Sequence, residues 1–334
     1  GSDGTLSFSS STTSQLNTQT QSTQLSSPYV QVLDYNGDGM ADLLNAATSE
    51  VFLNDGSGDW SGVATLGGTG SATLPDFGED FDLGGGDELT HIRFFDYDND
   101  RLIDVMRSDA QSTTVFRALG DNGYVQDTDV EAIGAGFDAE GMQLADINGD
   151  GLLDAVVLRA GQLSHRIHLG RGHWASWVDI NNLPVDADNL TFTSLEDLDG
   201  DGLDDLVIVE ADTVSYALNI NGNAFADLVQ VQSASGQSIP SRDNTTTVMF
   251  ADMNANGSND VVWVSSDGDV DVLDLFPVRP NLLSHLDNGL GLQSAITYGT
   301  AVAERARDGG DGWNHPLPSS TIVVTAVDTW AAAS

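Results

Sequence analysis

Cysteine and lysine are both absent from this chain of 334 residues, and basic residues of any kind are scarce. Without cysteine, disulfides, zinc–thiolate sites and thiol catalysis are excluded. There are 51 acidic residues against only 11 basic ones, all arginine, which gives a net charge of −40. Such a surface repels nucleic-acid phosphates and anionic membranes, and no apolar run approaches the roughly 18 residues of a membrane helix. We therefore expect neither a nucleic-acid partner nor membrane insertion.

The chain instead repeats one nine-residue acidic pattern five times, at residues 34–42, 96–104, 146–154, 197–205 and 252–260. Oxygen-bearing side chains occupy positions 1, 3, 5 and 9 of every copy. Alternate residues of a tight loop can point their oxygens inward, and the backbone carbonyl of position 7 adds one more, which suits the oxygen-rich shell of calcium. The candidate metal ligands are Asp34, Asn36, Asp38, Met40 and Asp42; Asp96, Asp98, Asp100, Leu102 and Asp104; Asp146, Asn148, Asp150, Leu152 and Asp154; Asp197, Asp199, Asp201, Leu203 and Asp205; and Asp252, Asn254, Asn256, Ser258 and Asp260.

Calcium is favoured over the other interpretations of these loops. An EF-hand needs a glutamate at position 12 and a helix on each side, but position 12 is never acidic here and the flanks have strand patterns. Magnesium requires a small octahedral shell that such loops accommodate poorly. We predict up to five calcium ions, one in each loop, as structural links in a chain that has no disulfides.

The five loops should not bind equally well. Loops 146–154 and 197–205 are the most regular, with glycine at position 6. Loop 96–104 has four carboxylates but carries Arg101 at that position, which strains the bend and adds a positive charge. Loop 252–260 has only two carboxylates and is predicted to bind calcium most weakly.

The loops recur about every 50 residues, a period that is typical of propellers and other repeat arrays. Each loop lies between two strand patterns, a third strand follows, and a fourth is expected near an aromatic residue. Four short antiparallel strands per period predict an all-β fold, a β-propeller of four-stranded blades. Five blades carry acidic loops, and a sixth is expected from an N-terminal strand and a C-terminal hairpin. The third strands are predicted at 50–53, 113–119, 166–169, 214–218 and 270–273.

Three regions follow from these patterns. Residues 1–28 are rich in serine, threonine and glutamine and are expected to form a linker or a closing strand. Residues 29–278 hold the propeller. Residues 279–334 contain a hairpin around 287–289 and a strand at 321–327, which we interpret as the closing hairpin and the start of a following β domain.

The acidic loops resemble the FG-GAP/VCBS repeats of integrin α-chain-like propellers and of many bacterial surface proteins, over about residues 29–276. Residues 279–298, Trp313 and the strand at 321–327 resemble the segment after the propeller in the B component of bacterial insecticidal toxin complexes, in SpvB and in Rhs-type proteins. The resemblance implies a secreted or surface-exposed bacterial protein. It also implies a docking module that binds a pore-forming or shell component of a toxin complex.

Two other functions remain open. A carbohydrate-binding lectin or adhesin could use Trp60, Trp174 or Trp177, although Trp60 and Trp174 lie where core aromatic residues are expected. An enzyme is not expected, because no nucleophile motif or phosphate loop is present. His165, His168 and His173 could suggest a transition-metal site, but a surface strand and turn is the favoured interpretation, since 165 and 168 would lie on opposite faces of a strand.

The charge and the longest insertion give two further expectations. The loops account for only part of the net charge, and the remainder suggests solubility in salty water, as in a marine or halophilic source, with a cationic partner as the alternative. The glycine-rich insertion at 67–86 is the first place to look for partner contacts, because insertions fall in loops and loops carry binding.

Overall fold

The computed structural model describes residues 30–36, 40–45, 50–54, 60–65, 91–120, 124–232, 238–243, 245–254, 256–265, 269–307 and 322–331. It divides into two compact units, residues 1–138 and 139–334, which are described separately. The described residues form strands almost throughout, with one short α-helix, α1 (Ala301–Arg307), and one 3-10 turn at Leu190–Phe192. None of the described helices is long and apolar enough to cross a membrane.

The first unit contains two four-stranded antiparallel sheets whose strands pair in sequence order. The first sheet is formed by β1 (Val30–Leu33), β2 (Asp42–Asn45), β3 (Glu50–Asn54) and β4 (Trp60–Thr65). The second is formed by β5 (Ile92–Phe95), β6 (Asp104–Ser108), β7 (Thr113–Ala118) and β8 (Tyr124–Gln126). In each sheet the acidic loop joins the first two strands, as the sequence predicts.

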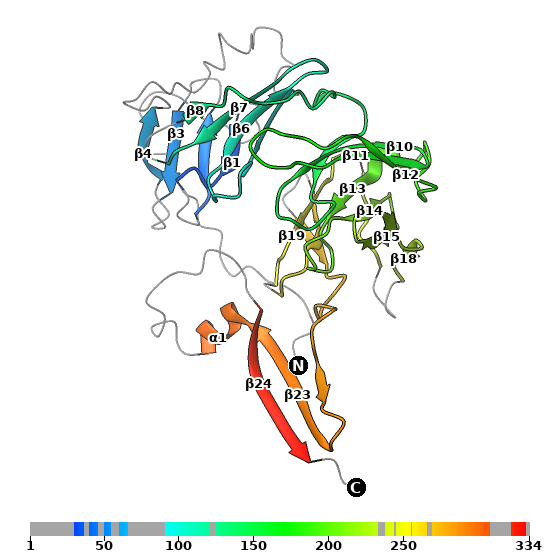
Figure 1. The fold of residues 1–334 in the computed structure, drawn as a ribbon. Coiled ribbons are helices and arrows are strands. Elements are labelled where there is room, and N and C mark those ends of the chain that lie inside the picture. Colours follow the sequence, from blue (N-terminus) through cyan, green and yellow to red (C-terminus); the bar gives the residue numbers. More distant parts are fainter. Residues whose placement is uncertain are drawn as a thin grey trace. The chain divides into compact units, whose positions relative to one another are not determined.

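The second unit repeats this arrangement (Figure 1). Its first sheet is formed by β9 (Met142–Ala145), β10 (Asp154–Arg159), β11 (Gln162–Arg166) and β12 (Val178–Asn181). The next contains β13 (Thr193–Glu196), β14 (Asp205–Val209), β15 (Val214–Ala217) and β18 (Val229–Gln230), with a small hairpin of β16 (Asn219–Ile220) and β17 (Ala224–Phe225) inserted. The fifth sheet has three described strands, β19 (Thr247–Ala251), β20 (Asp260–Val264) and β21 (Val270–Leu273).

A separate three-stranded sheet ends the described chain. It consists of β22 (His285–Asp287), β23 (Leu292–Thr300) and β24 (Ile322–Ala331) in that order. The predicted hairpin is therefore confirmed, and it pairs with β24 among the described residues. Residues 1–29, which were assigned to a linker or closing strand, and the insertion at 67–86 lie outside the described residues.

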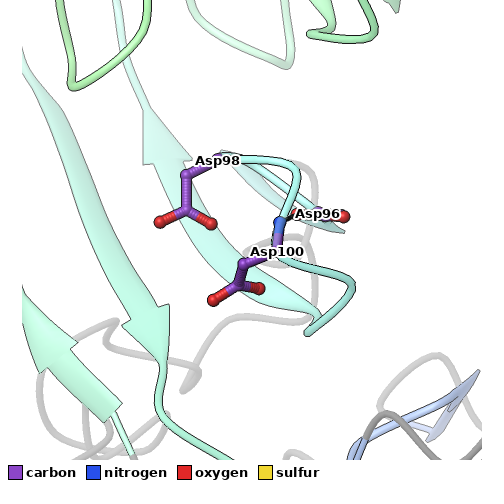
Figure 2. Close-up of side chains that lie close together, drawn as sticks. All are labelled: Asp96, Asp98 and Asp100. Carbon is purple, nitrogen blue, oxygen red and sulfur yellow. Dashed lines mark hydrogen bonds between the residues drawn. The ribbon is translucent and has the colours of Figure 1, made fainter.

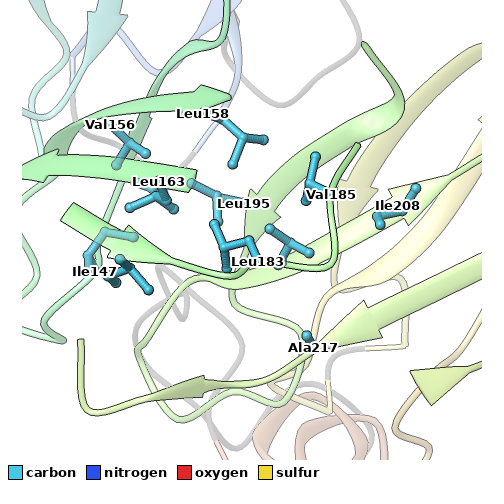
Figure 3. Packing of buried hydrophobic residues seen from close by; sticks show 12 residues of the cluster. Ile147, Val156, Leu158, Leu163, Leu183, Val185, Leu195, Ile208 and Ala217 are labelled. Atoms are coloured by element: carbon cyan, nitrogen blue, oxygen red, sulfur yellow. The ribbon is translucent and has the colours of Figure 1, made fainter. Parts of the chain in front are cut away.

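The strand that leaves each acidic loop forms the interior of its sheet. All five residues of β14 are buried, as are the first five of β10. These strands are rich in β-branched and aliphatic residues that pack well on both faces of a pleated sheet. Leu158, Leu163 and Leu195 meet in one cluster that joins the third and fourth sheets (Figure 3).

Gln143 on β9 links the same two sheets through polar contacts. Its side-chain nitrogen donates to the carbonyl of Thr193 at 3.0 Å, and its side-chain oxygen accepts from the backbone N–H of Leu195 at 3.2 Å. The first strands of neighbouring sheets thus face each other, so successive acidic loops are brought close together.

One strand prediction is wrong. The third strand of the third sheet was placed at 166–169, but β11 spans Gln162–Arg166. Gly161 has a φ of 74° and turns the chain back directly after β10, so β11 begins four residues earlier than predicted. Leu169, which was included in the predicted strand, is exposed.

Candidate metal centres

The aspartate at position 9 of each acidic loop is buried and fixes the loop to its sheet. Asp154 accepts from the backbone N–H of Ile147 at 3.1 Å and from that of His168 at 2.7 Å. Asp205 accepts in the same way from Leu198 and Asn219, at 3.2 and 2.7 Å. Asp42, Asp104 and Asp260 also accept from the N–H of loop position 2. Position 9 therefore joins the loop to its own strand. In the first four sheets it also accepts from a backbone N–H at the end of the third strand or two residues beyond it.

The aspartate at position 1 closes the loop on itself. Asp146 accepts from the backbone N–H groups of Gly149 and Gly151 at 2.7 Å each, and Asp197 does so from Gly200 and Gly202 at 2.7 and 3.0 Å. Both glycines of each loop have positive φ values, which explains why glycine is used there. In loop 197–205 the carboxylates of positions 1 and 3, Asp197 and Asp199, offer oxygens within 4.8 Å of each other.

Two groups of carboxylates could each hold a metal ion among the described residues. Asp197, Asp199 and Asp205 each offer an oxygen within 4.8 Å of the others, and so do Asp96, Asp98 and Asp100 (Figure 2). An all-oxygen set of carboxylates in a flexible loop is the donor chemistry that calcium prefers. The residues of these two loops therefore fit the predicted ion.

Burial makes the charged form of the position 9 carboxylates energetically unfavourable when no cation lies beside them. Loss of hydration raises the pKa of Asp104 and Asp154 to about 7 and that of Asp205 to about 8. It also raises the pKa of Asp260 to about 6. A divalent cation beside these groups would favour their charged form.

Loop 96–104 differs from its neighbours, as the sequence predicts. Arg101 replaces glycine at position 6 and has a φ of 72°, a conformation that costs energy for a residue with a side chain. Arg117 on β7 contacts Asp127 at 2.8 Å and Asp98 at 3.4 Å. The loop thus has a protein cation next to one of its candidate ligands, which should weaken its affinity for a second cation.

Loop 252–260 is held by amide side chains. Asn256 donates to the carbonyl of Phe276 at 3.0 Å, and Asn254 donates to the carboxylate of Asp274 at 2.8 Å. These bonds tie the loop to the segment after β21 without a metal. They support the prediction that this loop binds calcium most weakly. In loop 34–42, Asp38 lies outside the described residues.

Neighbouring loops in the second unit touch through their backbones, a feature that the sequence does not reveal. The N–H of Asp204 donates to the carbonyl of Asp146 at 2.8 Å, and the N–H of Asn259 donates to that of Asp197 at 3.4 Å. Asp204 also accepts from the N–H of Asp146 at 2.7 Å. Position 8 donates through its backbone N–H in both contacts, and the carboxylate of Asp204 adds a side-chain bond in the first of them.

The predicted surface position of two of the clustered histidines is wrong. His165 and His168 were assigned to a surface strand and turn, but they are 5% and 0% exposed. His168 stacks on the buried Trp174, with ring centroids 4.5 Å apart, and loss of hydration lowers its pKa to about 4. It is therefore a neutral core residue at pH 7. Trp174 is a core aromatic residue as predicted, whereas Trp177 is partly exposed.

Comparisons with known proteins agree with these repeats. The model of the FG-GAP-like repeat matches residues 96–157 and 197–263, so the chain carries FG-GAP-like repeats as predicted. No curated protein matches the chain.

Several solved structures share the fold. A Photorhabdus luminescens Tc holotoxin pore matches 91% of this chain at 19% identity with a TM-score of 0.60, and a TcdB2–TccC3 structure lacking its hypervariable C-terminal region matches 90% at 19% identity with a TM-score of 0.53. The match spans only 17% of each of those chains. An Agrocybe aegerita lectin that recognises non-reducing terminal N-acetylglucosamine matches 91% of this chain and 85% of its own, at 17% identity with a TM-score of 0.52. The predicted resemblance to toxin-complex components is confirmed at the level of the fold.

Proposed function

We propose that this chain is a calcium-stabilised β-propeller that serves as a non-catalytic docking module in a secreted bacterial protein of the toxin-complex B or Rhs type. The observation that carries the proposal is the combination of FG-GAP-like repeats with a fold match to Tc toxin structures over 91% of the chain. The proposed partner is a protein, the pore-forming or shell component of such a complex.

The architecture in this proposal is a closed ring of six blades. Five sheets follow one another in the chain, and closure would remove the exposed edge strands that invite aggregation. Residues 29–278 would form the ring, with 1–28 contributing a linker or closing strand. Residues 279–334 would close the ring and begin the next β domain.

Calcium in this proposal is structural. It would be held by side-chain oxygens at positions 1, 3, 5 and 9 of the acidic loops and by the carbonyl of position 7, and its charge would offset carboxylates such as Asp205 that are costly to bury. The chain's own contribution is the loop conformation, which Asp146 and Asp197 fix through their bonds to loop N–H groups.

A binding experiment tests the docking role. The purified chain is mixed with the pore-forming component encoded in the same genome, and complex formation is followed by biolayer interferometry with calcium and with EDTA. The proposal predicts saturable binding that weakens in EDTA, because the blades loosen without metal. No binding in the presence of calcium would contradict the docking role.

The alternative is a lectin, favoured by the fold match to the Agrocybe aegerita protein. A glycan array that includes glycans with non-reducing terminal N-acetylglucosamine separates the two proposals. Specific glycan binding at several equivalent sites would favour the lectin, whereas the docking proposal predicts no glycan signal above background.

A further inference from the structure

The segment after the fifth sheet, residues 274–281, contacts two acidic loops at once. Asn281 donates from its side-chain amide to the carboxylate of Asp199 at 3.1 Å, across 82 positions of the sequence. Asn281 has a φ of 61°, a turn conformation that asparagine tolerates better than most residues. Loss of hydration raises the pKa of the buried Asp199, and nearby Arg279 and the bond from Asn281 oppose that rise.

Arg279 packs against glycines of the same two loops. A Cβ atom on Gly200 would lie 2.6 Å from Nε of Arg279 and 2.2 Å from the carbonyl oxygen of Gly257. A Cβ on Gly257 would lie 3.0 Å from a terminal nitrogen of Arg279. The arginine side chain therefore fills a position that only glycine leaves open. A pocket of about 420 Å³ at this place is lined by residues of both loops and by Arg279 itself.

The C-terminal sheet, through the start of β24, also contacts loop 252–260 near Arg279. Cγ1 of Ile322, the first residue of β24, lies 3.4 Å from the Cβ position of Gly257. The amide of Asn256 holds the carbonyl of Phe276. The loops at 197–205 and 252–260 thus form the surface on which the segment 274–281 and the start of β24 are attached.

We infer that Asn281 is a positioning residue for the metal loop 197–205, and that cation binding in this loop and attachment of the C-terminal sheet are coupled. This inference rests on the proposed calcium binding. Asn281 bonds to one oxygen of Asp199, and this bond orients the carboxylate as a ligand before the ion binds. Because coupling between two equilibria is reciprocal, calcium in the loop tightens attachment of the segment by the same factor.

The test combines calcium titration calorimetry with hydrogen exchange on the whole chain. Asn281→Ala removes the amide donor, and Asn223→Ala is the matched control, since Asn223 donates to a backbone carbonyl in an exposed turn. We expect the affinity of the 197–205 site to fall about tenfold in Asn281→Ala, the lower end of the range for groups that orient metal ligands. Calcium should slow exchange of the amides of β22 and β23 in the wild type, and less so in this variant.

Three outcomes contradict the inference. If the wild type binds calcium but Asn281→Ala and Asn223→Ala have equal affinities, Asn281 does not position the site. If the affinity falls but exchange in β22 and β23 does not respond to calcium, the coupling does not exist. If the wild type binds no calcium, the proposed calcium binding fails together with the inference.

A glycine pair tests the attachment by a second route. Gly200 and Gly202 have φ values of 79° and 90°, but a Cβ on Gly202 meets no atom within 4 Å, whereas one on Gly200 meets Arg279 and Gly257. Substitution by alanine strains the backbone in both variants. We expect Gly200→Ala alone to speed hydrogen exchange at 279–300, and equal exchange in the two variants would contradict the attachment.

Discussion

At the scale of single residues, position 9 of the acidic loops has two roles. Asp205 is almost fully buried, accepts two backbone N–H groups and is one of three carboxylates that can meet at one ion. A buried carboxylate satisfied in this way supports the fold even without metal, because loss of a buried acceptor leaves its donors unpaired. Positions 1, 3 and 5 are more exposed in most loops, and in the proposed calcium sites they would act mainly as ligands of the ion.

Asp205→Asn separates these roles. In EDTA, where no metal contributes, the amide presents an NH₂ group to one of the two N–H donors, so we expect the free energy of unfolding to fall by about 2 kcal/mol. Asp201→Asn is the control, because Asp201 is exposed and, among the described residues, accepts only from the N–H of Leu203, which an amide oxygen can still satisfy. Urea unfolding measures both variants, and equal stabilities would refute a structural role for Asp205.

The raised pKa values predict how stability depends on pH. Asp104 and Asp154 have a pKa of about 7 and Asp205 of about 8, above the roughly 3.9 of an unfolded aspartate. The folded state thus holds these protons more tightly, so their contribution is complete below pH about 4 and is lost as pH rises through 7 to 8.

Thermal unfolding between pH 4.5 and 8.5 measures this loss. In EDTA the melting temperature should fall as the pH rises, and 1 M NaCl should leave much of the fall in place, because salt screens buried groups less than surface charge. Calcium should oppose the fall, since its affinity rises as the ligands lose protons. A melting temperature in EDTA that rises across this range would contradict the account.

At the scale of elements, the repeat itself specifies most of the sheet structure. The acidic loops mark the first two strands of each sheet, and β21 occupies the residues predicted for it, 270–273. Features set by the backbone conformation of one residue or by an insertion could not be predicted in this way. β11 begins early because of the backbone conformation at Gly161. In the fourth sheet, the small hairpin β16–β17 is inserted between the third strand, β15, and the fourth strand, β18, where the repeat predicts a single strand.

In the candidate site, too, some features could be predicted from the sequence and others could not. The side chains at positions 1, 3, 5 and 9 were predicted as ligands from spacing alone. Among the described residues the structure brings together three of them in each of two loops, Asp96, Asp98 and Asp100 and Asp197, Asp199 and Asp205. Asn281 was not identified, because its contact with Asp199 joins segments 82 residues apart. His165 and His168 were misplaced, because the burial of a polar residue depends on its packing partners and not on its own type.

Two glycines at hairpin ends give a prediction at this scale. Gly141 and Gly161 have the same φ of 74°, but a Cβ on Gly141 would lie 2.0 Å from the carbonyl oxygen of Leu158, whereas one on Gly161 meets nothing within 4 Å. Gly161→Ala should cost about 1 kcal/mol of unfolding free energy through backbone strain alone. Gly141→Ala should cost clearly more, because β9 must also shift away from β10. Urea unfolding of both variants checks the difference, and equal costs would contradict the packing at Gly141.

At the scale of the whole molecule, the protein has a net charge of −40 and no disulfide. Self-repulsion of this size destabilises a compact state, and repeated blades of few strands need additional links. Bound calcium would supply both counter-charge and connection at the loops. We therefore propose that the five loops are structural sites and that the docking function belongs to the surfaces that they hold in place.

The measurement that tests this claim most directly is thermal unfolding of the purified chain after exhaustive treatment with EDTA, followed by return of calcium. Ligand at about a hundred times its dissociation constant stabilises the folded state by about 2.7 kcal/mol per site. We therefore predict that the melting temperature falls by several degrees in EDTA and recovers with calcium. The same melting temperature in both conditions would contradict the account.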